Sequence, residues 1–261
     1  MLLQDKVTLI TGAGRGLGQA VAVAYARQGA RVIVTGRTPD ELEHTAGLIR
    51  SAGGHALALT VDVADDAAMA ATAGKILGQY GRLDVLVNNA GQLMLKSFEE
   101  MALAEWDNIL RVNLRGVVLG CKLFLGAMKT QGGGSIINVS SNAGVSGFAL
   151  ESAYCASKFG IEGFSRALAL ELQPHNIAVN TITPGKLPGG ATIKPTSLTQ
   201  AQFDALSPAE QARWADAIVL TEAFVFLARQ RGDGVTGQRV PAYELSEQIR
   251  QEGWNTVYRP F

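Results

Sequence analysis

The sequence has few of the residues that hold metals or form disulfide bonds. Only 2 cysteines, Cys121 and Cys155, and 3 histidines occur among its 261 residues. It contains neither a Cys-x-x-Cys pair nor a His-Glu-x-x-His motif, the spacings typical of redox-active, zinc-binding and metalloprotease sites. The composition therefore favours neither a disulfide framework nor a metal centre.

An excess of charge and long apolar runs are lacking too. The 23 basic and 23 acidic residues give a formal net charge of +0, so no strong field attracts nucleic acid or anionic lipid. No apolar stretch reaches the roughly 18 residues that a membrane-spanning helix requires, and Gln4 interrupts the first apolar residues. We expect a soluble cytoplasmic protein whose partners are small molecules, with neither nucleic acid nor a membrane among them.

What the sequence does have is an alternation of short apolar runs and longer helical patterns. Runs rich in Val, Ile and Leu predict strands at residues 7–11, 31–35, 56–61, 85–88, 135–139, 178–183 and 238–240. Continuous apolar character is typical of strands that are buried on both faces of a parallel sheet. The alternation predicts an α/β fold, a Rossmann-like doubly wound, mostly parallel seven-stranded sheet flanked by helices on both faces.

The helical patterns cover residues 17–28, 39–52, 66–80, 104–129, 152–173 and 215–229. A chain of 261 residues fits a single domain, because α/β folds often reach this length undivided. Residues 186–214 hold several prolines and glycines and predict a substrate lid with one or two short helices. Residues 241–261 form a C-terminal tail in which a polar helix and aromatic residues favour packing or a subunit contact.

Polar and glycine-rich signatures follow the predicted strands at their carboxyl ends. In chain order they are Gly12, Arg37, Asp62, Asn88 to Gly91, Ser140 with Ser141, and Pro184 with Gly185. In an open α/β sheet, ligands bind at this edge. We therefore expect the functional site there.

The run Thr11-Gly12-Ala13-Gly14-Arg15-Gly16-Leu17-Gly18 follows a predicted strand and opens a predicted helix. In that setting Gly12 permits a tight turn, Gly16 lets backbone N–H groups approach a pyrophosphate, and Gly18 allows close helix packing. Glycines also serve helix caps and turns that bind nothing. The succession of strand, turn and helix nevertheless favours a dinucleotide site.

The residue after the second strand bears on the choice of dinucleotide. An acidic residue there would bind the ribose of NAD, whereas this chain has Arg37. Arg15, from the glycine-rich turn, approaches the same region, and two guanidinium groups can hold a phosphate bidentately. The sequence therefore favours NADP(H) over NAD(H).

Three acidic residues close to this region need their own interpretation. Asp40 and Glu41 belong to Thr38-Pro39-Asp40-Glu41, which we interpret as a capping box with proline at the first helical position. Asp62 follows the third strand. It would either accept a hydrogen bond from the adenine amino group or cap the helix that follows.

Tyr154, Lys158 and Ser141 have a spacing that suits proton transfer. Residues four apart on a helix share a face with Cβ atoms roughly 5–6 Å apart, so Lys158 could act on the Tyr154 phenol. A positive charge about 4 Å away at an effective dielectric of about 20 favours the phenolate by roughly 4 kcal/mol. That would make Tyr154 a general acid/base. A Tyr-x-x-x-Lys pair alone is also common on solvated helix faces.

Taken together, the residues resemble the short-chain dehydrogenase/reductase family from Thr11 to Gln238. The matching pieces are the glycine-rich turn, Asn88-Asn89-Ala90-Gly91, Asn113, Ser141, Tyr154, Lys158, Pro184-Gly185 and Thr236-Gly237-Gln238. The resemblance implies hydride transfer between a nicotinamide and a carbonyl or secondary alcohol carbon, in a homodimer or homotetramer. It implies cofactor contacts from Gly12, Gly14, Arg15, Gly16, Leu17, Gly18, Arg37, Asp62, Val63, Asn89, Ala90, Gly91, Tyr154, Lys158, Pro184 and Gly185.

The resemblance also implies roles for the catalytic residues. Ser141 would orient the substrate oxygen, Tyr154 would pass the proton, and Lys158 would lower the tyrosine pKa and bind the nicotinamide ribose. Asn113 would hold a water in a proton relay, unless it merely caps or kinks its helix. Ser140 competes for the serine role, but the thirteen-residue spacing to Tyr154 favours Ser141.

Two positions depart from the family pattern. Gly189 stands where the family often has a threonine that contacts the nicotinamide amide, and Arg239-Val240-Pro241-Ala242-Tyr243 replaces the usual Asp-Gly-Gly segment. These departures concern how the lid closes on the cofactor and what the C-terminal tail does. Two other functions stay open besides NADP(H)-dependent hydride transfer. One is an NAD(H)-dependent alcohol or sugar dehydrogenase of the same family, and the other is a non-catalytic dinucleotide-binding sensor or scaffold.

The substrate is not determined by these motifs. Phe148 and Leu150 favour a partly apolar substrate, whereas Lys96, Lys186 and Lys194 leave room for an acidic or phosphorylated one.

Overall fold

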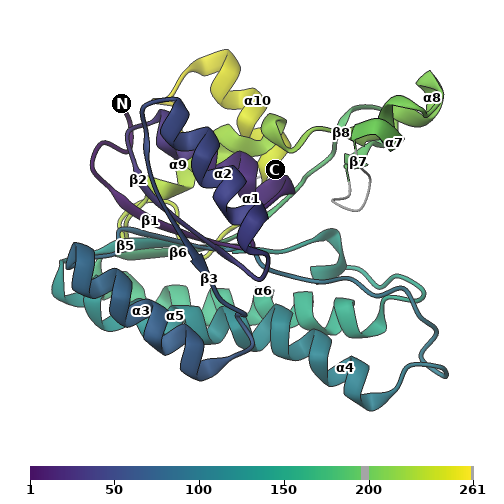
Figure 1. Ribbon diagram of the computed structural model, residues 1–261, viewed down its shortest axis with the longest axis horizontal. Coiled ribbons are helices and arrows are strands. Elements are labelled where there is room, and N and C mark those ends of the chain that lie inside the picture. The colour runs from purple at the N-terminus through teal and green to yellow at the C-terminus, as the bar shows by residue number, and fades with distance from the viewer. Residues whose placement is uncertain (195–199, 260–261) are drawn as a thin grey trace.

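The computed structural model describes residues 1–194 and 200–259, and a seven-stranded sheet lies at its centre (Figure 1). The strands are β1 (Val7–Thr11), β2 (Arg31–Gly36), β3 (His55–Thr60), β4 (Val85–Asn88), β5 (Gly134–Val139), β6 (Ile177–Thr183) and β9 (Arg239–Pro241). Their order is β3-β2-β1-β4-β5-β6-β9, and every neighbouring pair is parallel. The predicted doubly wound α/β fold is confirmed.

Helices cover both faces of this sheet, as the apolar character of the strands requires (Figure 1). One face carries α3 (Asp66–Tyr80), α5 (Gly116–Thr130) and α6 (Ser152–Leu172), and the other carries α1 (Gly16–Arg27), α2 (Pro39–Ser51) and α9 (Thr221–Ala228). Successive strand residues point to opposite faces. Leu9 therefore packs in a cluster with α5 and α6, whereas Ile10 packs in a second cluster with α1 and α9.

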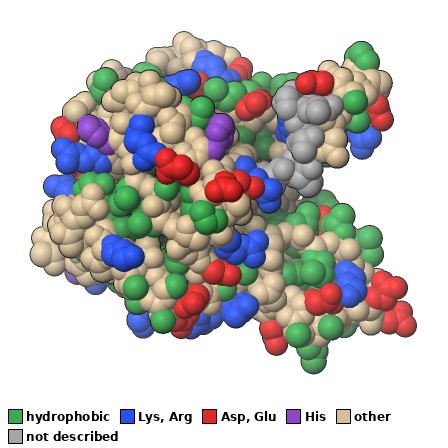
Figure 2. Space-filling model, in the orientation of Figure 1, with side chains coloured by type: hydrophobic (Ala, Val, Ile, Leu, Met, Phe, Trp, Pro, Cys, Tyr) green, Lys and Arg blue, Asp and Glu red, His purple; other side chains and the backbone are tan. Residues whose placement is uncertain are grey.

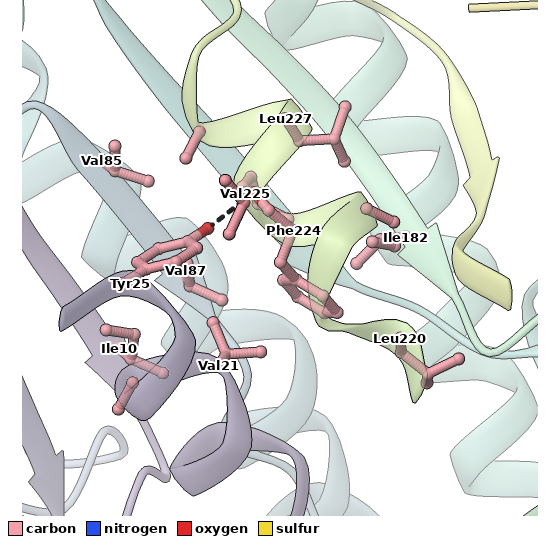
Figure 3. Packing of buried hydrophobic residues seen from close by; sticks show 14 of the residues in the cluster. Ile10, Val21, Tyr25, Val85, Val87, Ile182, Leu220, Phe224, Val225 and Leu227 are labelled. Atoms are coloured by element: carbon pink, nitrogen blue, oxygen red, sulfur yellow. Dashed lines mark hydrogen bonds between the residues drawn. The ribbon is translucent and has the colours of Figure 1, made fainter. Parts of the chain in front are cut away.

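Tyr25 joins α1 to α9 within the second cluster (Figure 3). Its ring is fully buried near Val21 and Ile10, and its hydroxyl donates a hydrogen bond of 3.0 Å to the carbonyl oxygen of Phe224. This bond satisfies the only polar atom of a large buried side chain. Burial also raises the pKa of Tyr25, so the hydroxyl remains a donor.

Two predicted helices are divided or shortened in the structure. The pattern at 104–129 consists of α4 (Leu103–Leu110), a π-helical turn (Arg111–Arg115) and α5. The pattern at 215–229 begins as the short strand β8 (Trp214–Ala215), continues as a 3₁₀ turn (Ala217–Leu220), and becomes α-helical only at Thr221. The Asp216 side chain accepts from the Ile218 amide and so starts the 3₁₀ turn, which delays α9.

The predicted lid at 186–214 lies partly outside the described residues, since 195–199, with Pro195, are not described. The described parts form a two-stranded sheet of β7 (Thr192–Ile193) and β8, together with α7 (Gln200–Asp204) and α8 (Pro208–Gln211). These elements project from the main sheet at upper right in Figure 1. In the tail, residues 242–252 form helix α10 (Ala242–Glu252), which packs against α9.

Asp84 fixes the amino end of β4 from a buried position. Its carboxylate accepts hydrogen bonds from the Arg82 guanidinium at 2.6 and 2.9 Å and from the Val7 amide at 3.0 Å, and it pairs with Lys6 at 3.3 Å. Burial alone would raise the pKa of Asp84. The hydrogen bonds from Arg82 and Val7 and the charge of Lys6 outweigh burial and hold this pKa below its usual value.

We predict that Asp84→Asn lowers the free energy of unfolding at neutral pH by about 1.5–3 kcal/mol, the usual contribution of a hydrogen bond to a charged group. Because the folded-state pKa of Asp84 is depressed, its stabilisation is present above the unfolded pKa and is lost as the pH falls through the folded one. Urea unfolding at neutral and at acidic pH measures both effects. Asp5→Asn, which removes an exposed pair with Arg31, is the control and should leave the transition unchanged. An equal loss in both variants would contradict the assignment.

Candidate functional site

A cavity of about 300 Å³ opens at the carboxyl edge of the sheet. Of the residues predicted to bind a cofactor, it is lined by Gly12, Gly14, Arg15, Leu17, Gly18, Arg37, Asp62, Val63, Asn89, Ala90 and Gly91. It is also lined by residues that were not predicted to bind a cofactor: Gly36, Thr38, Glu41, Leu42, Val61, Gln92 and Val112. The first four predicted strands therefore bring their carboxyl ends to one cavity.

The glycine-rich turn at this cavity leaves no room for side chains. Gly12 has a φ of +64°, and a Cβ there would lie 2.9 Å from the Cα of Ala90. A Cβ on Gly18 would collide with the carbonyl oxygen of Gly12. The side-chain amide of Asn89 donates to the carbonyl oxygens of Thr11 at 2.9 Å and Gly12 at 3.0 Å, which holds the turn against the end of β4.

This turn fits the pyrophosphate of a dinucleotide. No side chain caps the N-terminus of α1, because Arg15 at the N-cap position makes no capping hydrogen bond. The first N–H groups of the helix are thus available to an anion, which the helix dipole also favours. Gly16, at the start of α1, has a φ of +57° and shapes this end of the turn.

Charged residues lie at the far end of the cavity. Arg15 forms an ion pair of 3.3 Å with Glu41, whereas Arg37 is exposed and has no ion-pair partner in the described part of the chain. α2 begins at Pro39 as predicted, but Thr38 makes no capping hydrogen bond. The predicted capping box is therefore not formed, because the Glu41 carboxylate turns to Arg15 instead.

Of the two roles predicted for Asp62, an adenine contact and a helix cap, the structure contradicts the helix cap. Its carboxylate accepts from the Ala64 amide at 2.9 Å, which tightens the loop after β3, and it also lines the cavity. The cap of α3 is Asp65, which accepts from the Ala68 amide at 3.0 Å. The helix-cap interpretation of Asp62 is wrong, and its carboxylate remains on the cavity wall.

Tyr154 and Ser141 meet beside the end of β5. Ser141 caps the 3₁₀ turn at Asn142–Gly144, and its hydroxyl lies close enough to the phenol of Tyr154, in the first turn of α6, to lower the pKa of that phenol. The neighbouring Ser140 is buried, and its hydroxyl has no hydrogen-bond partner among the described residues. Of the two serines, only Ser141 is thus shown next to the phenol.

Lys158 lies one helical turn from Tyr154 but acts on it differently from our expectation. Its ammonium group is buried, donates to the carbonyl oxygen of Val139 at 2.8 Å, and lies 5.4 Å from the centre of the Tyr154 ring. Burial lowers the pKa of Lys158 to about 8, against the raising effect of Glu162. The pKa of Tyr154 is raised, mainly by burial and also by the charge of Glu151, although the Ser141 hydroxyl lowers it. The expected lowering by lysine is absent.

Asn113 joins the cavity to α6 through its side chain. It lies within the π-helical turn between α4 and α5, a distortion often found at functional sites. Its amide accepts from the Gln92 backbone N–H at 2.8 Å and donates to the Gln92 carbonyl oxygen at 2.9 Å and to Ser157 at 3.1 Å. Ser157 in turn donates to the carbonyl oxygen of Tyr154 at 2.7 Å.

Arg239, in the segment that replaces Asp-Gly-Gly, and Glu244, directly after that segment, are charged residues whose contacts sequence reasoning missed. Arg239 donates to the carbonyl oxygen of Ser141 at 3.3 Å and pairs at 3.3 Å with the buried Glu162. Glu244 accepts from the Lys186 amide at 2.9 Å. It thereby braces the turn at Gly185, whose φ is +84°. Glu162, the partner of Arg239, was also missed. Its position four residues after Lys158 on the same helix was the one sign in the sequence that it lies near that lysine.

Pro184 and Gly185 lie at the end of β6 but do not line the cavity. Among residues 1–194 and 200–259, no group of three or more His, Cys, Asp and Glu side chains is arranged to hold a metal ion. Within the same residues, no helix combines the length and apolar character needed to cross a membrane.

Comparison with known proteins agrees with this geometry. The family model of the short chain dehydrogenases matches residues 6–196. The chain is 40% identical over 182 residues to the D-threitol dehydrogenase of Mycolicibacterium smegmatis, covering 70% of either protein. It is 35% identical to the cyclopentanol dehydrogenase of Comamonas testosteroni, covering 91% of this chain and 95% of the relative.

A solved structure shows the same likeness in three dimensions. A metagenomic short-chain oxidoreductase in complex with NADP superposes with a TM-score of 0.78 at 32% identity, over 92% of this chain and 99% of the other. Both the sequence and the fold thus lead to one conclusion: the chain belongs to the short-chain dehydrogenase/reductase family of oxidoreductases, which bind a nicotinamide dinucleotide.

Proposed function

We propose that this protein is an NADP(H)-dependent oxidoreductase that acts on a carbonyl compound or the corresponding secondary alcohol. The observation that carries the proposal is that Ser141, Tyr154 and Lys158 come together at the end of β5, on the same edge of the sheet as a cavity whose glycine turn fits a dinucleotide. When bound, the nicotinamide supplies or accepts the hydride.

In this proposal the chain moves the proton and holds the oxygen. Tyr154 gives its hydroxyl proton to the oxygen of a carbonyl substrate, and Ser141 donates a second hydrogen bond to that oxygen as its charge develops. The raised pKa of Tyr154 supports this assignment, since the phenol keeps its proton near neutrality. Lys158 brings a positive charge next to Tyr154, and Asn113 fixes the cavity wall at Gln92 relative to α6.

The choice of NADP(H) rests on Arg37 and Arg15. Arg37 is exposed at the cavity, where a phosphate would complete its hydrogen bonds. The NADP in the similar metagenomic structure supports the same choice. One observation favours NAD(H) as the alternative, namely the pairing of Arg15 with the Glu41 carboxylate inside the cavity. A phosphate at this position would have to displace Glu41.

We predict that Tyr154→Phe lowers kcat by about 10²–10⁴-fold, the usual contribution of a general acid or base. Steady-state oxidation of NADPH with an accepted ketone measures the loss, and NADPH titration should give an unchanged Kd. Tyr80→Phe, at the end of α3, is the matched control and should retain full turnover. Near wild-type turnover in the Tyr154 variant would refute the proposed mechanism.

For the cofactor, we predict that Arg37→Ala weakens NADPH binding by about 10- to 100-fold, because one charge-assisted contact contributes roughly 1.5–3 kcal/mol. NADH binding should change little, and fluorescence titration of both dinucleotides measures the difference. Arg31→Ala, at the opposite end of β2, is the control. Glu41→Gln should tighten NADPH binding, since it frees Arg15. Tighter binding of NADH than of NADPH by the wild-type protein would overturn the preference.

The Lys158 pKa of about 8 gives a pH prediction. Glu162 raises this pKa, so Glu162→Gln should lower it and deprotonate Lys158 at a lower pH. The alkaline decline of kcat/KM for carbonyl reduction should then begin at lower pH than in the wild type. Glu171→Gln, an exposed change on the same helix, should leave the pH profile unmoved. A coincident decline in all three proteins would show that Lys158 does not set this limb.

A further inference from the structure

Leu150 has a backbone conformation that leucine rarely adopts. Its φ is +66°, in the left-handed region that favours glycine. It is the third residue of a four-residue turn in which the Glu151 amide donates to the carbonyl oxygen of Phe148 at 3.2 Å. A branched side chain at this position raises the energy of the turn, and such strain is concentrated at functional sites.

Leu150 belongs to a group of exposed apolar side chains that we call the apolar rim. Its members are Leu93, Leu95, Val145, Phe148 and Leu150, which are between 47% and 63% exposed. The two segments of the rim are joined, because the Lys96 amide donates to the carbonyl oxygen of Leu150 at 2.9 Å. Contiguous exposed apolar surface often marks a binding site.

One segment of the rim, residues 145–150, lies between Ser141 and the proposed proton donor Tyr154 in the sequence. Val145 ends the 3₁₀ turn that Ser141 caps, and Leu150 lies just before α6, which carries Tyr154. The other segment of the rim follows Gln92, whose backbone is held by Asn113. Figure 2 shows hydrophobic side chains gathered on the lobe at lower right, across a hollow from the lobe that carries α7 and α8.

Two of the three lysines that leave room for an acidic substrate are engaged, whereas Lys186 is exposed and forms no ion pair among the described residues. Lys96 forms a 2.7 Å ion pair with Glu105, and the ammonium group of Lys194 lies 4.5 Å from the centre of the Phe203 ring. Neither charge is therefore free to attract an acidic substrate, since binding one would require breaking an existing contact.

Carboxylates near the reacting groups act in the opposite direction. The charge of Glu151 reaches the Tyr154 hydroxyl strongly enough to raise the pKa of that group. At the turn after β6, Glu244 uses one carboxylate oxygen on the Lys186 amide, and its other oxygen is buried without a hydrogen-bond partner among the described residues. Of the two, Glu151 acts on Tyr154 itself, and its charge would repel a carboxylate or phosphate on the substrate.

We propose that the apolar rim binds the hydrocarbon part of an uncharged ketone or secondary alcohol, and that Leu150 determines this specificity. This proposal rests on the proposed function, because it assigns the substrate class of the same site. The strained backbone of Leu150 is then explained: the turn presents an apolar side chain to the substrate where glycine would present none.

Three probes of one length test the substrate class. They are methyl hexyl ketone and two analogues in which the terminal methyl group is replaced by carboxylate or by ammonium. Each is titrated calorimetrically into the full-length protein saturated with NADP⁺, so that binding is measured without turnover. We expect the neutral ketone to bind at least about tenfold more tightly than the carboxylate, and more tightly than the ammonium analogue. Tighter binding of either charged analogue would overturn the proposal.

Leu150→Gly separates binding from stability. Glycine suits the left-handed backbone, so the unfolding temperature should be equal to or higher than that of the wild type. The Kd of the neutral ketone should nevertheless rise about fivefold to tenfold, because the apolar contact is lost. Leu48→Ala, an exposed leucine on α2, is the control and should leave this Kd unchanged.

An unchanged Kd of the neutral ketone with Leu150→Gly would contradict the proposal. If the variant then also had a smaller mass in solution, the rim would be a contact between copies of this chain. A failure of the proposed function has a different signature, namely that no ketone is reduced although the three probes still bind in the expected order.

Discussion

The constraint on which the rest of the structure depends is that all seven strands are parallel and that the central ones, β1, β4 and β6, are buried on both faces. A strand such as β1, with five buried residues in succession, has no place for a polar side chain that must remain accessible. Because parallel strands end at one edge, the groups that do chemistry are collected there. Gly12 after β1, Asn89 after β4 and Ser141 after β5 are neighbours for this reason.

The two halves of the site are then held together by a few short polar contacts. Asn113 connects the wall of the dinucleotide cavity to Ser157, and Ser157 reaches the backbone of Tyr154. Lys158 ties α6 to the end of β5 through the carbonyl oxygen of Val139. The π-helical turn around Asn113 is part of this arrangement, since it places a polar amide at a position that is otherwise buried. The side chains of the site are therefore held in place by hydrogen bonds to backbone groups as much as by contacts with one another.

Strands and helices that consist of continuous apolar runs with glycines at their ends are predicted well from the sequence. The first and fourth strands begin and end where predicted, because burial on both faces leaves a continuous signal. The division of 104–129 was missed, since a π-helical turn keeps the apolar pattern of a helix. Glu162 and Arg239 were missed because their pairing crosses from α6 to β9 and leaves no local pattern. The direction of the Tyr154 pKa was wrong because spacing predicts proximity but not burial.

Burial also explains why the pKa of Tyr154 is raised, whereas a nearby lysine alone would lower it. Removing both groups from water disfavours the ammonium form of Lys158 and the phenolate form of Tyr154 together. The site therefore holds a protonated phenol near neutrality, which for the proposed reaction is the form that donates to a carbonyl oxygen. The apolar rim acts in the same sense, because a hydrocarbon group bound there would keep water away from both groups. Substrate choice and proton position thus depend on one property, the exclusion of water from the end of β5.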